Sequence, residues 1–472
     1  MSNRFMKTEF VKAENPGQKR SSRQIDMTSG PIFSKLLVFS VPLILSSLLQ
    51  LLFNAADVIV VGRYVGSNAL AAVGSTAPLI NLLVNLFIGL TVGSNVVAAG
   101  FFGAGDKAGV ERTVHTSYFL SAAGGIILTF AGVVFSPQIL ALMGSPEDVL
   151  PLSALYLRIY FGGIIPTVVY NFGSSLLRAK GDTKRPLYIL FAAGIINVVL
   201  NLVFVIFFRL GVAGVSLATV ISQTFSAFCM TFILMRERDC FRLEFRKIRV
   251  HTDILAKILK IGVPAGVQGM IFSFSNVIIQ SSANAYGAVV VAGNSASQSV
   301  EGFIYTSMNG FAQGVLTFVS QNRGAKKFSR VGQVYRRALA SVAVIGGLLG
   351  FLVILFGQQI FSVFSDNQAV VDAARSRMFI IAATYFLCGL MDCTANTLRG
   401  LGYSMAPMLI TLVGACGLRI LYLAFFYQIP RFHTYHSIFV SYPVSWGVTF
   451  IVLLLVLAAV LKKFRGLESK AC

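Results

Sequence analysis

The stretch "LQLLFNAADVIVVGRYVG", residues 49–66, places one carboxylate inside a long apolar segment. Gln50 and Asn54 precede Asp57 by seven and three residues, so all three side chains project from one stripe of a helix. An uncompensated acid in hydrocarbon costs roughly 2.5–3.5 kcal/mol. A neutral residue would serve a purely structural role at lower cost, and we therefore expect Asp57 to have a function.

Carboxamides and a hydroxyl in later apolar segments are the candidate neighbours of Asp57. Asn197 and Asn201 lie four residues apart in one segment, and Asn171 and Thr219 lie in the segments before and after it. An ionised acid in such surroundings binds a small cation through hard oxygen ligands, and a protonated acid hydrogen-bonds to the same amides. The sequence thus predicts a site for Na⁺ or H⁺. The structural alternative for each Asn is an interhelical hydrogen bond worth about 0.6 kcal/mol.

A second set of polar residues lies in the other half of the chain. The candidates there for binding an ion or a substrate are Glu301, Asp392, Asn276, Gln280 and Asn396. Glu301 can act as a second cation ligand, as a binder of cationic substrate or as a partner of Arg419. Asp392 shares a helix face with Asn396 and Arg399, so an internal Asp–Arg pair is its structural alternative.

The elements that position both sets must cross a membrane. Of the 472 residues, 56% are hydrophobic and 12% are charged, and the mean hydropathy is +0.76. A soluble protein carries about twice that charged fraction. We expect an all-α, polytopic membrane protein with twelve transmembrane helices. Their expected ranges are 33–61, 69–100, 114–136, 150–177, 187–208, 212–235, 254–281, 288–319, 338–356, 376–398, 406–428 and 437–461.

The basic residues predict the orientation of these helices. Of the 39 Lys and Arg residues, 32 lie in the N-terminal segment, the C-terminal tail and the loops of one side. The other side has only Arg63, Arg209, Arg375, Arg377 and Arg431. By the positive-inside rule both termini are cytoplasmic, in a multi-pass protein of the cell membrane. Topology and contact with the lipid bilayer explain the net charge of +21, and we expect no binding of nucleic acid.

The chain also repeats itself. "RAKGDTKRP" from residue 178 and "RGLGYSMAP" from residue 399 share the pattern R-x-x-G-x-x-x-x-P at an offset of 221 residues. Pro42 pairs with Pro264, and Asn54 with Asn276, at an offset of 222. Two six-helix lobes with the same orientation are related by a pseudo-two-fold axis along the membrane normal, an arrangement typical of secondary transporters. The expected divisions are an N-terminal segment (1–30), an N-terminal lobe (31–235), a linker that lets the lobes move (236–253), a C-terminal lobe (254–461) and a tail (462–472).

Together these motifs resemble the multidrug and toxic compound extrusion (MATE) family. The resemblance covers about residues 30–465 and rests on "PLILSSLLQLLFNAADVIVVG", "GFFGAGDK", "LLRAKGDTKRP" with its echo "LRGLGYSMAP", and "NVVLN". It implies a V-shaped pair of lobes that export organic cations and other amphipathic drugs. It also implies that inward movement of Na⁺ or H⁺ drives export by alternating access.

The resemblance assigns roles to some residues and leaves others open. Asp57 matches the acid that family members use for cation coupling, and Gln50, Asn54, Asn197 and Thr219 match its polar neighbours. Asn201 stands where many relatives have a second Asp. Asp392 matches an acid of the sodium-coupled branches, but Phe272 stands where those branches have a Glu.

We therefore expect a monomeric exporter of amphipathic, cationic small molecules that needs no resident cofactor. The alternative within the same superfamily is a lipid-linked saccharide flippase, which Arg158 and Arg419 favour and the internal acids oppose. A channel or a scaffold leaves the duplicated halves unexplained. An enzyme is not expected, because the four His residues lie at helix ends or in loops and no nucleophile–base pair or metal-ligand spacing occurs.

Overall fold

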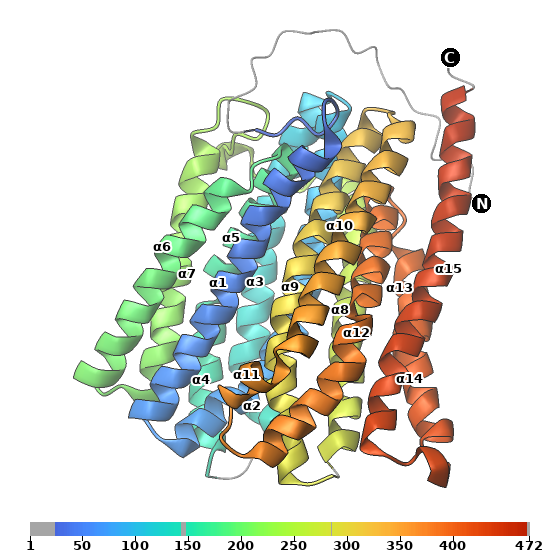
Figure 1. The fold of residues 1–472 in the computed structure, drawn as a ribbon. Coiled ribbons are helices and arrows are strands. Elements are labelled where there is room, and N and C mark those ends of the chain that lie inside the picture. Colours follow the sequence, from blue (N-terminus) through green and yellow to red (C-terminus); the bar gives the residue numbers. More distant parts are fainter. Residues whose placement is uncertain (1–23, 143–147, 285, 470–472) are drawn as a thin grey trace.

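The computed structural model describes residues 24–142, 148–284 and 286–469, which form a bundle of long, nearly parallel helices without strands (Figure 1). The first half contains α1 (Ile32–Tyr64), α2 (Ser67–Gly103), α3 (Lys107–Leu142), α4 (Leu150–Gly162), α5 (Ile164–Lys180), α6 (Lys184–Leu202), the π-helical η1 (Val203–Phe207) and α7 (Gly211–Met235). The second half contains η2 (Phe245–Lys247), α8 (Thr252–Asn284), α9 (Ala288–Gly324), α10 (Phe328–Leu355), α11 (Gly357–Ser362), α12 (Gln368–Gly400), α13 (Met405–Thr411), η3 (Leu412–Gly417), α14 (Leu418–Leu421), η4 (Tyr422–Phe426), η5 (Pro430–Phe432) and α15 (Tyr435–Ser469).

The expectation of an all-α membrane protein with two six-helix lobes is confirmed. Within the described residues, ten helices are long and apolar enough to cross a membrane, and α4 with α5 forms an eleventh span. The remaining long helix, α9, has 37 residues but a more polar sequence. Several helices begin earlier than expected, and α12 starts at residue 368 instead of 376.

One expected helix is broken. The range 150–177 was expected to be continuous, but α4 and α5 meet at Gly163 and are bent by 49°. Two adjacent glycines weaken the helix there, and Pro166 cannot donate the backbone hydrogen bond to residue 162. The side chain of Val220 fills the space that a side chain at Gly163 would need. The bend therefore lets α7 pack against the junction.

The lobes pack together through backbone. Gly89 of α2 lies so close to Gly266 of α8 that a side chain at either position would overlap backbone atoms. At the ends of α2 and α9, Gly103 meets the backbone of Gln321 in the same way. Close approach of this kind is what small residues permit between membrane helices.

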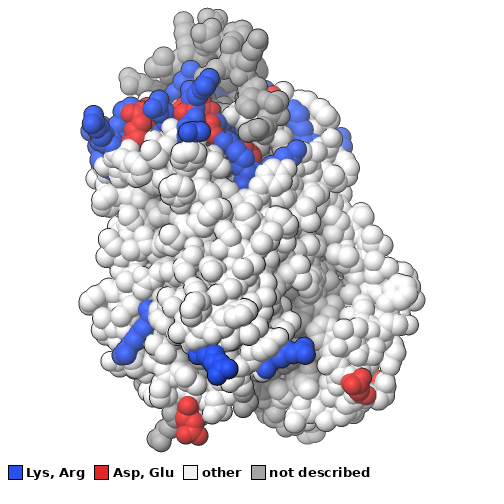
Figure 2. Space-filling view, turned by 90° about the vertical axis from the view of Figure 1, so that its left-hand side faces the viewer, with Lys and Arg blue, Asp and Glu red and all other residues white. Residues whose placement is uncertain are grey.

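These contacts lie towards the end of the bundle where Lys and Arg gather, which Figure 2 shows at its top. We call it the basic end; Lys180 and Arg236 lie there at the ends of α5 and α7, and Lys257 and Lys327 lie at the starts of α8 and α10. In the opposite half of α8, Phe274 and Val277 are 63% and 55% exposed. The lobes are therefore closed against each other at the basic end and less so at the opposite end.

Helix α1 belongs to both lobes. In its first half Phe39 stacks edge-on against Phe318 of α9, with 5.7 Å between ring centroids. In its second half the ring of Phe53 packs against Gly194 of α6. Pro42 lies inside the first half and removes one backbone hydrogen bond. One helix thus connects the interior of the N-terminal lobe to the core of the C-terminal lobe.

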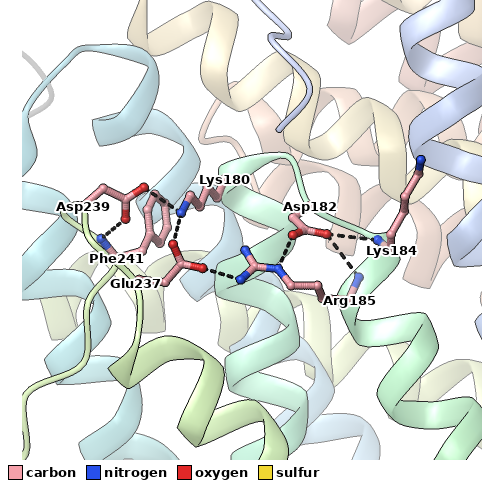
Figure 3. Close-up of polar contacts among 7 residues, drawn as sticks. All are labelled: Lys180, Asp182, Lys184, Arg185, Glu237, Asp239 and Phe241. Carbon is pink, nitrogen blue, oxygen red and sulfur yellow. Dashed lines mark hydrogen bonds and ion pairs between the residues drawn. The ribbon is translucent and has the colours of Figure 1, made fainter. Parts of the chain in front are cut away.

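The linker between the lobes is fastened to the N-terminal lobe by a cluster of charged residues (Figure 3). Lys180, which is 1% exposed, forms ion pairs with Glu237 and, at 2.6 Å, with Asp239. Arg185 pairs with Asp182 and, at 2.5 Å, with Glu237. A buried charge requires partners of this kind, because breaking such a pair leaves an uncompensated ion.

The rest of the linker also lies on the N-terminal lobe. The backbone N–H of Glu244 donates to Nε2 of His115 at 3.2 Å, and the N–H of His251 donates to Thr116 at 3.3 Å. Phe241 and Leu243 are buried in the core of the lobe. Residues 237–251 therefore remain with the N-terminal lobe, and movement of the lobes would have to bend the chain near the start of α8.

We expect the contact between Gly89 and Gly266 to limit which substitutions α2 tolerates. Gly89→Ala places a methyl group into the backbone of α8, and overpacking of this kind typically costs about 1–3 kcal/mol. The matched control is Gly74→Ala in the same helix, where nothing lies within 4 Å of the new methyl group. Thermal unfolding and hydrogen exchange of residues 258–270 measure the effect. Equal melting temperatures and exchange rates in the two variants would contradict it.

Candidate ion site

Asp57 of α1 faces α6, where two of the five carboxamides predicted near it, Asn197 and Asn201, lie. Its carboxylate accepts a hydrogen bond from the amide of Asn201, which is fully buried. The same amide of Asn201 also donates to Asn197 at 3.3 Å, and Asn197 donates to the hydroxyl of Thr219 at 3.3 Å. Thr219 is also within hydrogen-bonding reach of Asp57. The structure therefore brings three helices, α1, α6 and α7, together around one carboxylate.

The amide of Asn201 leaves one oxygen without a donor. Its nitrogen is used by Asp57 and Asn197, and its buried Oδ1 atom has no hydrogen-bond partner among the described atoms. A buried acceptor without a partner costs about 1–3 kcal/mol. Together with the Asp57 carboxylate it gives the site two kinds of oxygen ligand, which are the ligands that hard cations prefer. The residues present therefore fit a small cation.

The local helix geometry places these side chains. Asn197 and Asn201 are four residues apart on α6 and so lie on one face. Directly after Asn201 the helix widens into the π-helical η1, a feature that is frequent at functional sites.

Three other predicted residues lie away from the carboxylate. The side chains of Gln50 and Asn54 are exposed on α1 and make no hydrogen bond with Asp57. They lie nearer the part of α1 that leaves α6 and packs against α9. Residues on the same face of α1 as Asp57 therefore do not all reach the site around Asp57. Asn171 donates to the backbone of Thr167 on its own helix and lines a small, mostly apolar cavity.

In the C-terminal lobe, Glu301 forms an ion pair. Its Oε1 atom lies 2.6 Å from Nη2 of Arg377, and Arg377 also donates to the backbone oxygen of Asn294 at 2.7 Å. Arg377 is 1% exposed and lies over the ring of Phe439. The sequence predicts a helix that begins at residue 376, which would place Arg377 at the membrane surface. The earlier start of α12 puts this arginine two turns inside the helix.

Arg419 is a second buried cation in this lobe. It is 2% exposed, donates to Ser445 at 3.0 Å and to Asn276 at 3.5 Å, and lies 4.1 Å from the ring of Tyr442. Among the described residues no carboxylate lies within ion-pair distance of it, so pairing with Glu301, which was one of three alternatives for that acid, is not formed, and Glu301 pairs with Arg377 instead. The interior of this lobe therefore carries more positive than negative charge around Glu301.

The remaining candidates of the C-terminal lobe lie in separate places. Asp392 lies beside Tyr305, whereas Asn396 accepts a hydrogen bond from Arg399 at 2.8 Å. Gln280 accepts hydrogen bonds from Asn294 and, at 2.6 Å, from Gln298. The five candidates thus form no single site like that around Asp57.

The repeat explains this asymmetry. At the offset of 222 residues that relates Pro42 to Pro264 and Asn54 to Asn276, Asp57 corresponds to Ile279. The acid is replaced by a hydrocarbon side chain. The equivalent position in the C-terminal lobe therefore cannot hold a cation in the same way. Comparison of the two halves shows this in the sequence itself.

The fold and these sites define a class of protein, a polytopic membrane transporter built from two parallel repeats. The MatE family model matches the chain twice, over residues 42–203 and 264–425. The chain belongs to the MATE family, and it is therefore a transporter and not an enzyme.

Individual relatives agree with this assignment. The "Probable multidrug resistance protein YoeA" of Bacillus subtilis (strain 168) is 31% identical over 398 residues, which cover 82% of this chain and 86% of the relative. The "Multidrug export protein MepA" of Staphylococcus aureus (strain N315) is 23% identical over 394 residues, covering 83% and 87%. A solved structure described as the outward-facing conformation of a multidrug resistance MATE family transporter superposes with a TM-score of 0.88 at 21% identity, covering 95% of this chain and 100% of the other.

We expect Glu301 to be needed for stability. Glu301→Gln leaves Arg377 as a buried charge without its partner, a change that typically costs about 3–5 kcal/mol. The double variant Glu301→Gln, Arg377→Leu removes the charge and should regain most of that loss. Thermal unfolding measures both, with Asp372→Asn on the exposed face of α12 as the control. A single variant as stable as the control would contradict the role of the ion pair.

Proposed function

We propose that this transporter exports amphipathic small molecules across the cell membrane in exchange for Na⁺ or H⁺ that binds at Asp57. The observation that carries the proposal is the half-buried carboxylate of Asp57, which accepts a hydrogen bond from the amide of Asn201, whose own oxygen has no donor among the described residues. In this site Asp57 and Asn201 would hold the ion, and Asn197 and Thr219 would position Asn201. The protein acts as a monomer in this proposal.

The orientation follows from the charges. The basic end carries most of the exposed Lys and Arg side chains (Figure 2), and such residues are enriched in cytoplasmic loops. We therefore place the basic end, with both termini, on the cytoplasmic side. The lobes are in backbone contact towards that side, which supports assigning this structure to a state in which cargo leaves towards the outside.

The residues of the C-terminal lobe support different roles for the two lobes, with ion binding in the N-terminal lobe. Glu301 is neutralised by Arg377, and the position equivalent to Asp57 is Ile279, so the ion site lies in the N-terminal lobe only. Asp392 remains a candidate for contact with a cationic cargo, because no ion pair of its carboxylate with Arg399 is formed within 4.0 Å.

Coupling requires that the ion prefers one arrangement of the lobes. A ligand that binds two conformations equally shifts neither, however tightly it binds. Helix α1 supplies the connection, since Asp57 contacts α6 of one lobe while Phe39 packs in the core of the other. Binding of Na⁺ or H⁺ at Asp57 changes the charge between α1 and α6. This change biases the angle at which α1 passes from the N-terminal lobe to the C-terminal lobe.

The relatives support export of drugs. Proteins that share about a quarter to a third of their residues with this chain carry the names multidrug export protein and multidrug resistance protein. A lipid-linked saccharide flippase is the second candidate, and the buried Arg419 is the observation that favours it. The acid site at Asp57 and the match of both halves to the MatE model favour the exporter.

We expect Asp57→Asn to abolish coupled export. The variant keeps the shape of the site but cannot exchange charge, so ethidium efflux from right-side-out vesicles should fall to the leak rate under imposed Na⁺ and pH gradients. Asp372→Asn, which removes an exposed acid, should leave efflux unchanged. Efflux by Asp57→Asn at the wild-type rate under both gradients would refute the proposal, and the gradient that drives the wild type identifies the ion.

We further expect Asn201 and Asn54 to differ, although both were predicted neighbours of Asp57. Asn201→Ala removes a hydrogen bond to a charged group, worth about 1.5–3 kcal/mol, and should weaken ion-driven efflux about tenfold or more. Asn54→Ala removes an exposed side chain and should change the rate less than about twofold. The ion concentration for half-maximal efflux is the measurement. Equal values for the two variants would contradict the placement of the site.

A further inference from the structure

The chain crosses the basic end just before α1 as an irregular segment, residues 25–30, which we call the strap (Figure 1). Its five backbone oxygens from Asp26 to Gly30 all accept hydrogen bonds from side chains. Lys35 donates to the oxygens of residues 26 (2.7 Å) and 29 (2.8 Å), and Asn322 donates to that of residue 27 (3.0 Å). Lys327 donates to the oxygen of residue 28 (2.9 Å). Arg330 donates to the oxygens of residues 27 (3.3 Å), 29 (2.8 Å) and 30 (2.9 Å). The strap has no secondary structure, and side chains hydrogen-bond to each of its backbone oxygens from Asp26 to Gly30 in place of backbone donors.

Most of these donors belong to the C-terminal lobe. Asn322 is fully buried at the end of α9, and Arg330 lies in the first turn of α10. The side chain of Met27 is fully buried in the core of the same lobe. The strap is therefore fixed to the C-terminal lobe by several charge-assisted hydrogen bonds and one buried side chain.

Apart from Lys35, which lies in the half of α1 that packs on the C-terminal lobe, the described residues of the N-terminal lobe show one hydrogen bond to the other end of the strap. The backbone N–H of Ile25 donates to the oxygen of Gly181 at 3.3 Å, in the turn between α5 and α6. Gly181 has a φ of +102°, and a Cβ atom there would lie 2.7 Å from the oxygen of Ile25. The turn thus has a notch that the strap fills, and this contact is much weaker than the attachment to the C-terminal lobe.

The repeat shows what is special about this notch. Gly402 corresponds to Gly181 at the offset of 221 residues and has a similar φ of +91°. Its notch is filled by the guanidinium of Arg323, which comes from the same lobe. At Gly181 the occupant is held by the opposite lobe instead. The notch at Gly181 is therefore a contact between the lobes, whereas the equivalent notch at Gly402 is not.

We propose that the strap is a latch that holds the lobes closed at the basic end and leaves the notch at Gly181 when that end opens. Firm attachment on one side and a single hydrogen bond on the other fit a contact that breaks and forms in each cycle. The strap continues directly into α1, the helix that carries Asp57, so the latch and the ion site lie on one continuous piece of chain. This inference rests on the proposed export by alternating access.

The first test bridges the strap reversibly to either lobe in the full-length protein. Ile25→Cys with Lys184→Cys joins it to the N-terminal lobe, and Thr28→Cys with Lys327→Cys joins it to the C-terminal lobe, each with a short bifunctional reagent that a reductant cleaves. We expect the first bridge to stop ethidium efflux until it is cleaved and the second to leave efflux within about twofold of the unbridged rate. Unchanged efflux with the first bridge in place would overturn the latch.

The second test needs no transport and so separates the latch from the proposed function. Thr317 is 1% exposed and donates to Asn95 of the other lobe at 3.1 Å, so Thr317→Cys reports opening of the basic end through its labelling by a maleimide. Asn322→Ala and Arg330→Ala remove four of the strap's hydrogen bonds and so release its hydrogen bond to Gly181, which is worth about 0.5–1.5 kcal/mol; labelling should therefore speed up about tenfold. Arg337→Ala, on the exposed face of α10, is the matched control.

The native thiols set the background of this measurement. Burial and the neighbouring Asp239 raise the pKa of Cys240 to about 11, which keeps it protonated and slow to react, and the parent protein without Thr317→Cys measures the remainder. Labelling at the rate of the Arg337→Ala control would overturn the latch. If the unbridged protein shows no gradient-driven efflux, the proposed function fails, while the labelling result still decides whether the strap holds the lobes.

Discussion

A carboxylate in the middle of a membrane helix constrains everything around it. The acid at position 57 is compensated by one buried amide, and that amide is positioned by a second amide and a hydroxyl from α6 and α7. This compensation is incomplete, because Asn201 keeps a buried oxygen without a donor. A fully satisfied network would be rigid and inert, whereas an incomplete one has room for an ion.

The second constraint is the close contact of the two lobes at the basic end. Glycines bring α2 into backbone contact with α8 and α9, and packed interfaces of this kind switch between arrangements and do not deform continuously. Helix α1 joins the two constraints, since its ends belong to different lobes. The charge state of one side chain can therefore be felt at an interface several helical turns away.

The sequence predicted much of this fold because hydrophobic segments and internal repeats extend over many residues and follow directly from the membrane environment. Hydrophobic length located ten spans and the bent pair of α4 and α5, while α9 is more polar, and the offset between Pro42 and Pro264 revealed two equivalent halves. The sequence also predicted that Asn197, Asn201 and Thr219 meet Asp57, because polar side chains rarely occur in such apolar segments without a partner. The same argument failed to separate Gln50 and Asn54 from the site, since helix periodicity cannot show where α1 leaves one lobe for the other.

Other features depend on three-dimensional packing that no local pattern encodes. The partner of Glu301 was missed because the start of α12 was placed eight residues too late, which left Arg377 at a membrane surface. The linker looked like a free, charged connector, but its acids pair with Lys180 and Arg185 across the fold. Contacts between residues far apart in sequence require the structure.

Infrared difference spectroscopy of the purified protein tests the central claim most directly, because it detects the carboxyl group itself. Adding Na⁺, or raising the pH, should change a carboxyl band in the wild-type protein, and that change should be missing from Asp57→Asn while the bands of other acids remain. Identical difference spectra for the two proteins under both conditions would show that Asp57 neither binds an ion nor exchanges a proton, and would contradict the account.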